Sequence, residues 1–333
     1  LEQLNETILD GATAQKIIDS AETLPGLLDS LLDGLEGIAR FEIVVVDNDS
    51  QDGSADLALA HPIEPRVIRA GRNAGYAAAI NMACATIDPE ADLLVLNPDI
   101  RLRPGCVRRL AHGFRQTGVG AVVPRILNED GTTALSLRRE PTLVTAWSDA
   151  LLGPKRAARL GLGSMRAGPK LYERDQTVEW ATGAAMMVSA EARGKVGPWD
   201  ESFFLYSEEV EYQRRLRSKG FVISYVADAR LCHTGGEYVQ SPFLMALLTF
   251  NQSRYYSRYH GPLATSLFRL SLVAYGLLNG IRSESHRSGL KAALATFGPN
   301  RHTGIGGSDG ANWPWNPADA ISPAGPMPRD RTK

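Results

Sequence analysis

The chain has 333 residues, of which 44% are hydrophobic and 22% are charged, and its formal net charge at pH 7 is -1. These values are typical of a globular protein with one large domain or two smaller ones, and the near-neutral charge excludes a global electrostatic attraction to nucleic acid. The cysteines, Cys84, Cys106 and Cys232, are far apart and lack CxxC spacing, which argues against a disulfide framework or a zinc site and favours a reducing cytoplasm.

The first two fifths of the chain alternate helical and strand-like patterns. Residues 1–15 have neither the basic nor the apolar region of a secretory signal peptide. Apolar residues at helical spacing predict a helix over 22–35, and the continuous β-branched run Ile43–Val46 predicts a strand that is buried on both faces. The alternation continues with a helix from Ser54 to His61, an Ala-rich helix after Gly75, an apolar strand before Asn97, a helix after Pro104 and a strand after Gly118.

This order of elements predicts an α/β fold in which helices cover both faces of a mostly parallel sheet. In such sheets ligands bind at the carboxyl ends of the strands. Two acidic turns, DNDSQD and NPD, follow predicted strands, so we expect them to lie at the same edge of the sheet. Asp99 on its own would be interpreted as a turn residue, but this position makes it a ligand candidate.

The rest of the chain changes character. Weak periodicity over residues 137–172 predicts loops and short helices. Residues 263–282 form a mostly apolar run with the length of a bilayer span, but Arg269 and Asn279 dilute it, which favours an interfacial or core-packed helix. We expect a helical extension over 241–296, followed by a disordered or surface-draped Gly/Pro-rich tail over 297–333.

Six motifs occur in one order along the chain: VVVDNDSQDGS, RNAGYAAAIN, LLVLNPD, ATGAAMMV, GPWDESFFLYSEEVEYQRRLRSKG and LCHTGG. Together they resemble glycosyltransferase family 2, most closely its rhamnosyltransferase-like branch. The resemblance implies the single-domain nucleotide-diphospho-sugar transferase fold and a metal-dependent, inverting transferase. It divides the domain into a nucleotide-sugar-binding half, residues 1–125, and an acceptor and catalytic half, residues 126–240.

The resemblance implies a donor site in the first half. Asp47 would accept a hydrogen bond from the imide N–H of a uracil or thymine ring, and Asp49 flanks it. The segment from Asn73 to Asn81 would cover the nucleotide and diphosphate, where Gly75 permits close backbone approach. An Asx turn at Asp49 and a simple helix start after Gly75 are the alternative interpretations.

The resemblance also implies a site for Mg²⁺ or Mn²⁺. Asp99 matches the acidic DxD motif of the family, with Asn97 in place of the first aspartate, so one carboxylate is left. Asp99, two diphosphate oxygens and His233 would complete the coordination. On its own, His233 in a glycine-rich loop would be interpreted as a surface histidine.

Acceptor and catalytic residues follow from the same resemblance. Glu209, preceded by Glu208, occupies the position of the catalytic base, where the family usually has Glu-Asp. The alternative is a carboxylate cluster that supports a helix dipole. The residues expected on the acceptor side, of which both tryptophans could equally belong to the core, are Trp180, Thr182, Gly183, Trp199 and Asp200.

One segment departs from the family. Its members open with an apolar strand that ends in Tyr-Asn or Tyr-Asp, whereas this chain has Ile17, Ile18 and Asp19, preceded by Gln15 and Lys16, which are poor residues for a central strand. Either the strand is degenerate or the N-terminal sequence is foreign to the family.

We therefore expect a hexosyltransferase that moves a sugar, with dTDP-L-rhamnose as the first candidate donor and UDP-hexoses as the second. The acceptor would be a hydroxyl of a cell-surface glycan or a polyprenyl-linked saccharide, and no nucleic acid is expected as a partner. The apolar run 263–282 with Arg254 and Arg258 would suit peripheral membrane contact, which places the protein in the cytoplasm, free or at the inner face of the membrane. A catalytically impaired nucleotide-sugar or glycan-binding module is the alternative.

Overall fold

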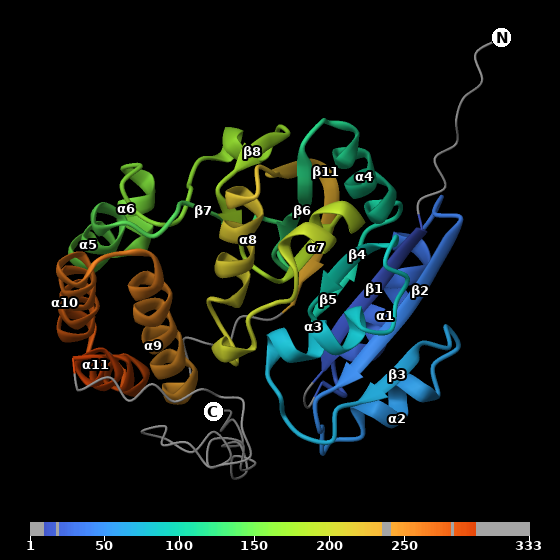
Figure 1. Ribbon diagram of the computed structural model, residues 1–333, viewed down its shortest axis with the longest axis horizontal. Helices are drawn as coiled ribbons and strands as arrows, with labels where there is room; N and C mark the ends of the chain where they lie inside the picture. The colour runs from blue at the N-terminus through green and yellow to red at the C-terminus, as the bar shows by residue number, and fades with distance from the viewer. Residues whose placement is uncertain (1–9, 18–19, 235–240, 281–282, 298–333) are drawn as a thin grey trace, which may run out of the picture.

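The computed structural model describes residues 10–17, 20–234, 241–280 and 283–297 (Figure 1). A nine-stranded sheet in this part of the chain has the order β3-β2-β1-β4-β10-β6-β11-β5, and β8 pairs with β11 outside this path. Its strands are β1 (Asp10–Ile17), β2 (Arg40–Asp47), β3 (Arg66–Arg69), β4 (Asp92–Leu96), β5 (Ile100–Leu102), β6 (Val119–Leu127), β8 (Gln176–Val178), β10 (Ala185–Val188) and β11 (Val222–His233). A small second sheet pairs β7 (Leu137–Arg138) with β9 (Trp180–Ala181).

Helices cover both faces of the large sheet, as the sequence predicted. The β-branched run of β2 alternates between the two faces: Val44 and Val46 pack with α3 (Tyr76–Cys84), α7 (Ala190–Val196) and α8 (Glu208–Ser218), while Ile43 and Val45 pack with α1 (Leu24–Gly34), α2 (Ser54–Leu59) and α4 (Cys106–His112). The buried strand needs apolar residues at successive positions because both of its faces are covered.

The predicted α/β fold class is confirmed, and parallel pairing is confined largely to the N-terminal half. Strands β3, β2, β1 and β4 are all parallel to one another. Strand β10 is antiparallel to both β4 and β6, and β11 is parallel to β6 but antiparallel to β5 and β8. The predicted boundary at residues 125 and 126 lies inside β6, so the two halves share one sheet.

The atypical first strand takes a central place in the sheet. Its backbone pairs with β2 on one side and with β4 on the other, with Ile17 opposite Asp47 and Gln15 opposite Leu96. Pairing from both sides satisfies the backbone groups of the strand whatever its propensity. Ile18 and Asp19, where the family pattern is broken, lie outside the described residues.

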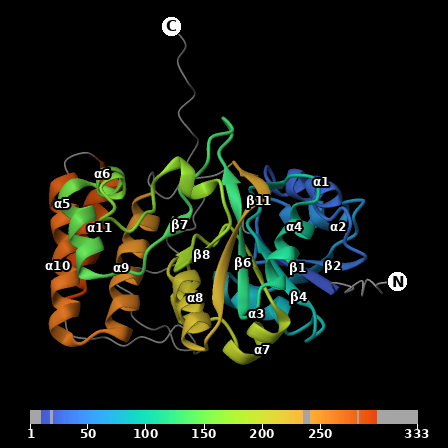
Figure 2. The same cartoon turned by 90° about the horizontal axis from the view of Figure 1, so that it is seen from above.

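Five helices gather beside the sheet and form what we call the helical extension (Figures 1 and 2). They are α5 (Leu143–Leu152), α6 (Pro154–Arg159), α9 (Pro242–Tyr259), α10 (Pro262–Asn279) and α11 (Glu284–Ala295). Helix α10 packs against α5, α9 and α11. The predicted extension over 241–296 therefore also recruits two helices from the middle of the chain, where we expected loops and short helices.

None of the described helices is both long and apolar enough to cross a membrane. Helix α10 is the apolar run for which the sequence left interfacial and core-packed alternatives. The predicted tail lies outside the described residues from residue 298 onward.

Candidate active site

The loops after β2 and β3 are held together at the carboxyl edge of the sheet. Asp47, the last residue of β2, is 4% exposed, and its Oδ1 accepts a hydrogen bond of 3.1 Å from the amide of Ser50. The fully buried Asn48 donates through Nδ2 to Asn73 Oδ1 at 3.3 Å and to the Gly75 carbonyl at 3.2 Å. The structure thus brings Asp47, Asn73 and Gly75 to one place. Asn48, which joins them, carries no mark in the sequence that predicts this role.

Asp49 and Asp52 shape the turn after β2. Asp49 has a φ of 73°, in the left-handed region that Asn and Asp tolerate better than most residues, and its side chain is exposed. Asp52 accepts hydrogen bonds from the amides of Ser54 at 3.0 Å and Ala21 at 2.8 Å. Burial alone would raise the pKa of Asp52. The hydrogen bonds from Ser54 and Ala21 together have the larger effect, so the pKa lies below its ordinary value.

Gly75 is required where the donor-side loop meets the segment before α8. Its φ is 91°, and a Cβ at this position would lie 2.5 Å from the backbone oxygen of Phe204. The next amide, that of Tyr76, donates to the same oxygen at 2.7 Å. The close backbone approach predicted for Gly75 is therefore toward the protein's own chain.

The Tyr76 hydroxyl connects the two halves of the site, and the sequence reasoning missed it. It lies 2.9 Å from the Gly183 carbonyl and 3.1 Å from Asn97 Oδ1. Burial raises the pKa of Tyr76 well above its usual range, and the carboxylates of Glu208, Glu209 and Asp99 raise it further. Tyr76 therefore remains a neutral donor among carboxylates. The only signal in the sequence was its place in RNAGYAAAIN.

The structure brings Asp99 and His233 together. Antiparallel pairing of β5 and β11 sets His233 opposite Ile100, and His233 Nε2 lies 3.0 Å from Asp99 Oδ2. Thr234 fixes the same turn, because its amide and its hydroxyl both donate to the Asp99 carbonyl at 3.0 Å. Contacts over more than a hundred residues of sequence thus fix this pair.

These two side chains fit a divalent cation. Oδ1 of Asp99 is buried and accepts no hydrogen bond from any described residue, and His233 adds an imidazole nitrogen beside Oδ2. The carboxylate suits Mg²⁺ or Mn²⁺, and the imidazole nitrogen is a ligand that Mn²⁺ accepts better than Mg²⁺ does. Within the described ranges no three His, Cys, Asp or Glu side chains cluster as a metal site, so further ligands would have to come from a bound donor.

The predicted catalytic pair begins α8. Glu208 is 3% exposed and Glu209 is half-buried. A Cβ on Gly183 would lie 3.2 Å from the Glu209 Cβ, so the absence of a side chain at Gly183 lets the two segments approach. Burial raises the pKa of Glu209, and the nearby Arg138 partly opposes this shift. Oε2 of Glu209 is buried and makes no hydrogen bond with the described residues.

Asn81 and Trp199 brace this arrangement from the core. The Asn81 side chain donates to the Trp199 carbonyl and accepts from the Trp199 amide, both at 2.9 Å. Trp199 is 4% exposed and stacks on Tyr212 with a centroid distance of 4.2 Å. Of the two alternatives that the sequence left for Trp199, the structure favours the core residue. Nucleotide contact by Asn81 remains a prediction, although its amide is engaged within the protein.

Trp180 lies in β9, and Thr182 begins the segment between β9 and β10. Trp180 is half-buried, packs against the cluster of Phe203, Val210 and Tyr255, and donates from Nε1 to the Arg139 carbonyl at 2.8 Å. The Thr182 amide donates to the Ser136 carbonyl at 3.0 Å, and its side chain is partly exposed. Both remain predicted acceptor-side residues.

Asp200 is engaged by the helical extension. Its carboxylate forms an ion pair with Arg258 of α9 and accepts a hydrogen bond of 2.9 Å from the Ser202 amide. Burial alone would raise the pKa of Asp200. The hydrogen bonds from Arg258 and Ser202 together have the larger effect, so the pKa lies below its ordinary value. Arg254 donates to the Ser202 carbonyl. Arg254 and Arg258, for which we expected membrane contact, thus hold the segment that contains Asp200, and their contact with a membrane stays a prediction.

A second set of contacts joins the extension to α8, and nothing in the local sequence indicated it. Glu140 forms ion pairs with Arg214 at 2.5 Å and with Arg217, and it accepts a hydrogen bond from Tyr255 of α9. One turn from Tyr255, the Tyr259 hydroxyl donates to Glu211 at 2.9 Å. The helix that begins with the two catalytic candidates is therefore held along its length by α9.

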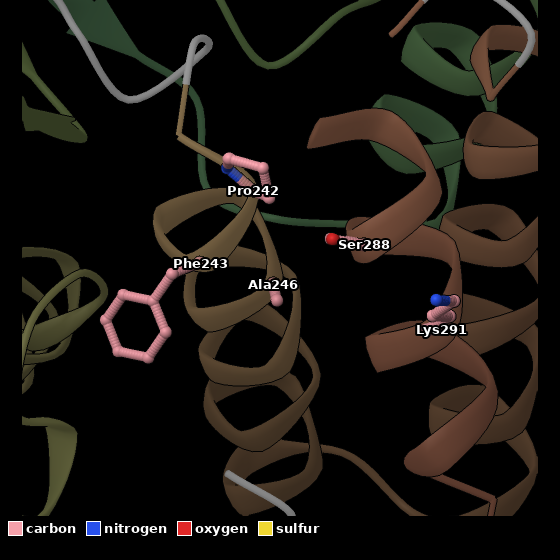
Figure 3. A pocket seen from close by; sticks show the side chains of 5 residues that line it. All are labelled: Pro242, Phe243, Ala246, Ser288 and Lys291. Atoms are coloured by element: carbon pink, nitrogen blue, oxygen red, sulfur yellow. The ribbon is translucent and has the colours of Figure 1, made fainter. Parts of the chain in front are cut away.

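A hollow of about 240 Å³ lies elsewhere, between α9 and α11 (Figure 3). Figure 3 shows Ser288 and Lys291 on the α11 side, with the Phe243 ring directed away from them on the other side of α9. None of the predicted site residues lines this hollow. The full set of lining residues is Pro242, Phe243, Ala246, Ser288 and Lys291.

Comparisons with known proteins show the family of this chain. The model of the glycosyl transferase family 2 matches residues 17–188. An N-acetylglucosaminyl-diphospho-decaprenol L-rhamnosyltransferase of Mycobacterium tuberculosis is 30% identical over 202 residues, which cover 57% of this chain and 66% of the relative. The low-salt glycan biosynthesis hexosyltransferase Agl10 of Haloferax volcanii is 29% identical over 199 residues, 59% of each chain.

A solved structure shares the fold. A mannosyltransferase from Pyrobaculum calidifontis, in complex with GDP-mannose and Mn²⁺, is similar with a TM-score of 0.51 and 15% identity, over 87% of this chain and 81% of that chain. At this identity the likeness extends to the fold alone.

Proposed function

Because this chain belongs to glycosyl transferase family 2, we propose that it is an inverting glycosyltransferase whose catalytic base is Glu209. The observation that carries the proposal is that the Tyr76 hydroxyl contacts both Asn97, two residues before Asp99, and Gly183, which in turn lies against Glu209. These residues come from four segments that only the fold brings together. A binding module would have no need of a buried carboxylate with an unused oxygen, because such a group costs free energy in the folded state.

The donor in this proposal is a pyrimidine nucleotide sugar, with dTDP-L-rhamnose first and UDP-hexoses second. The rhamnosyltransferase relative supports the first choice and its name supports a lipid-diphosphate acceptor. The matched region spans 66% of the length of that relative, so both substrates are part of the proposal. Asp47 would accept the hydrogen bond of the pyrimidine imide, in a loop that Asn48 holds in place.

The diphosphate end of the donor would lie at Asp99. Asp99 and His233 would hold the cation, which would supply charge neutralisation for the leaving diphosphate. The Tyr76 hydroxyl keeps Asn97 in place beside this pair. Asn97 itself provides an amide oxygen and no charge, so Asp99 is the principal carboxylate of the diphosphate site.

Glu209 would remove the proton of the acceptor hydroxyl. Burial raises the pKa of Glu209, so its ionised carboxylate is a stronger base than that of an exposed glutamate. The acceptor would approach from the side of Trp180 and Thr182, because the chain that follows them brings Gly183 against the Glu209 side chain.

The replacement Glu209→Gln tests the proposal. We expect transfer from dTDP-rhamnose in the presence of Mn²⁺ to fall at least about 100-fold, because positioned proton transfer contributes about 10²–10⁴-fold. In the wild type, kcat/KM should fall as the pH decreases through a value above the ordinary Glu pKa of about 4.3, because the base must be ionised and its pKa is raised. The residual activity of the variant should not show this decrease of kcat/KM at low pH.

Two controls make the test specific. The exposed Glu191→Gln on α7 removes a carboxylate that is paired only with Lys195, and it should leave the rate unchanged. The free energy of unfolding of Glu209→Gln should exceed that of the wild type at neutral pH, because a group with a raised folded-state pKa loses its stabilising contribution as the pH rises through that pKa. Equal rates for Glu209→Gln and wild type would remove Glu209 as the base, and dTDP binding without any turnover would favour the binding module.

A further inference from the structure

The helical extension exposes an uncharged apolar stripe along α10. Leu263, Leu267, Leu270 and Leu277 are 76%, 37%, 46% and 60% exposed, and their spacing places them on one face of the helix. Arg269 does not interrupt the stripe, because its guanidinium is turned toward α9, where it donates to the Ser253 hydroxyl at 2.9 Å. Exposed apolar stripes of this kind mark interaction surfaces in soluble proteins.

Next to this stripe, the α5–α6 turn combines leucines with cations. Helix α5 packs against α10, and its exposed Leu151 (62%) is followed after α6 by Leu160 (64%). Between them the exposed Lys155, Arg156 and Arg159 make no ion pair with a described residue. The sequence from residue 150 to residue 172 contains no acidic residue at all. This region therefore has a local positive charge that the net charge of the chain conceals.

We propose that these two parts form one surface, the basic–apolar face, that docks on an anionic lipid bilayer. Its members are Leu151, Lys155, Arg156, Arg159, Leu160, Leu263, Leu267, Leu270 and Leu277.

The composition of the face distinguishes a bilayer from a protein partner. Leucines that enter the boundary between headgroups and acyl chains, flanked by cations that attract anionic headgroups, are the pattern of peripheral membrane surfaces. Protein–protein interfaces are instead enriched in aromatic residues, of which the face has none. Helices α10 and α5 lie on the side of the extension away from the sheet, so the face is free of the site (Figure 2).

The inference deepens the proposed function, because a lipid-linked acceptor requires the site to work near a membrane, but its own evidence is independent of the donor chemistry. The test therefore uses vesicles that contain neither donor nor acceptor. The full chain is sedimented with vesicles of phosphatidylcholine and with vesicles of phosphatidylcholine and phosphatidylglycerol in equal parts. We expect binding to the second only, and we expect it to weaken as salt screens the cations.

Two variants locate the face. The triple replacement of Lys155, Arg156 and Arg159 by Gln should weaken partition into the anionic vesicles about 100-fold, from the contribution of each cation near such a surface. Replacement of Leu263, Leu267 and Leu270 by Ser should weaken it about 10-fold or more. The matched control replaces Leu57 and Leu59 of α2, which are 43% and 57% exposed, by Ser and should change nothing.

Several results would overturn the proposal. The first is absence of binding to the anionic vesicles, and the second is an equal loss of binding in the α2 control. The third is a wild-type dimer in light scattering that dissociates in the α10 variant, because this would assign the face to a second copy of the chain. Transfer to a short soluble acceptor is measured in parallel. If that activity is absent while vesicle binding follows the face, the proposed function fails and the membrane surface remains.

Discussion

The sheet domain and the helical extension differ in the groups that they place unfavourably. The sheet domain buries carboxylates, with Asp47 and Glu208 at 4% and 3% exposure and an unpaired oxygen on both Asp99 and Glu209. The extension leaves leucines in water, up to 76% exposed at Leu263. A buried carboxylate oxygen without a hydrogen bond costs free energy relative to an exposed one, and an exposed leucine costs free energy relative to a buried one. In our two proposals, each region keeps its unfavourable groups for a ligand, a phosphorylated donor in the first and a lipid surface in the second.

The largest expected effect concerns the buried carboxylate of the sheet domain. Asp99→Ala should reduce metal-dependent transfer roughly 10³-fold or more, because a cation on a phosphoryl oxygen contributes several kcal/mol to the transition state. Asn97→Ala should cost less, since it removes a neutral amide that the Tyr76 hydroxyl contacts at 3.1 Å. Steady-state kinetics over a Mn²⁺ titration measures both. Full activity of Asp99→Ala would return this residue to a turn-forming role.

The next effect tests whether the two regions act as one body. Glu140→Ala should lower the free energy of unfolding by about 3 kcal/mol, because it leaves Arg214 and Arg217 without their shared, largely buried partner. Urea denaturation measures the change. The exposed pair of Arg69 and Asp56 offers a control, and Asp56→Ala should cost no more than about 1 kcal/mol. A Glu140 variant as stable as this control would mean that α9 and α8 are joined only loosely.

The smallest effect examines the approach of Gly183 to Glu209. Gly183→Ala would place a Cβ 3.2 Å from the Glu209 Cβ, so α8 must shift by a few tenths of an ångström and kcat should fall about 10-fold. Gly194→Ala in α7 is the matched control, because a Cβ there meets nothing within 4 Å and Ala favours a helix. The comparison of kcat with thermal stability for the two variants separates misplacement of the base from general damage. An unchanged kcat for Gly183→Ala would show that the spacing tolerates a methyl group.

Local patterns were sufficient for the frame of the sheet domain. The β-branched run ending at Asp47 could be recognised because a strand covered on both faces needs apolar residues in succession. The acidic start and basic end of α8 follow the helix dipole, and Glu208 and Glu209 stand at its start. The first strand was the hardest element, because the pairing of β1 with both β2 and β4 outweighs the low strand propensity of Gln15 and Lys16.

By itself, the sequence of this protein determined the α/β class and the strand ends where Asp47 and Asp99 stand, because strand and helix patterns depend on neighbours a few residues away. Only the tertiary structure decided the partners. Tyr76 meets Gly183 across 107 positions of sequence, and Arg258 meets Asp200 across 58. It also placed α5 beside α10, two helices that lie more than a hundred residues apart in the sequence. Such contacts are set by packing in three dimensions, which leaves no periodic mark on the chain.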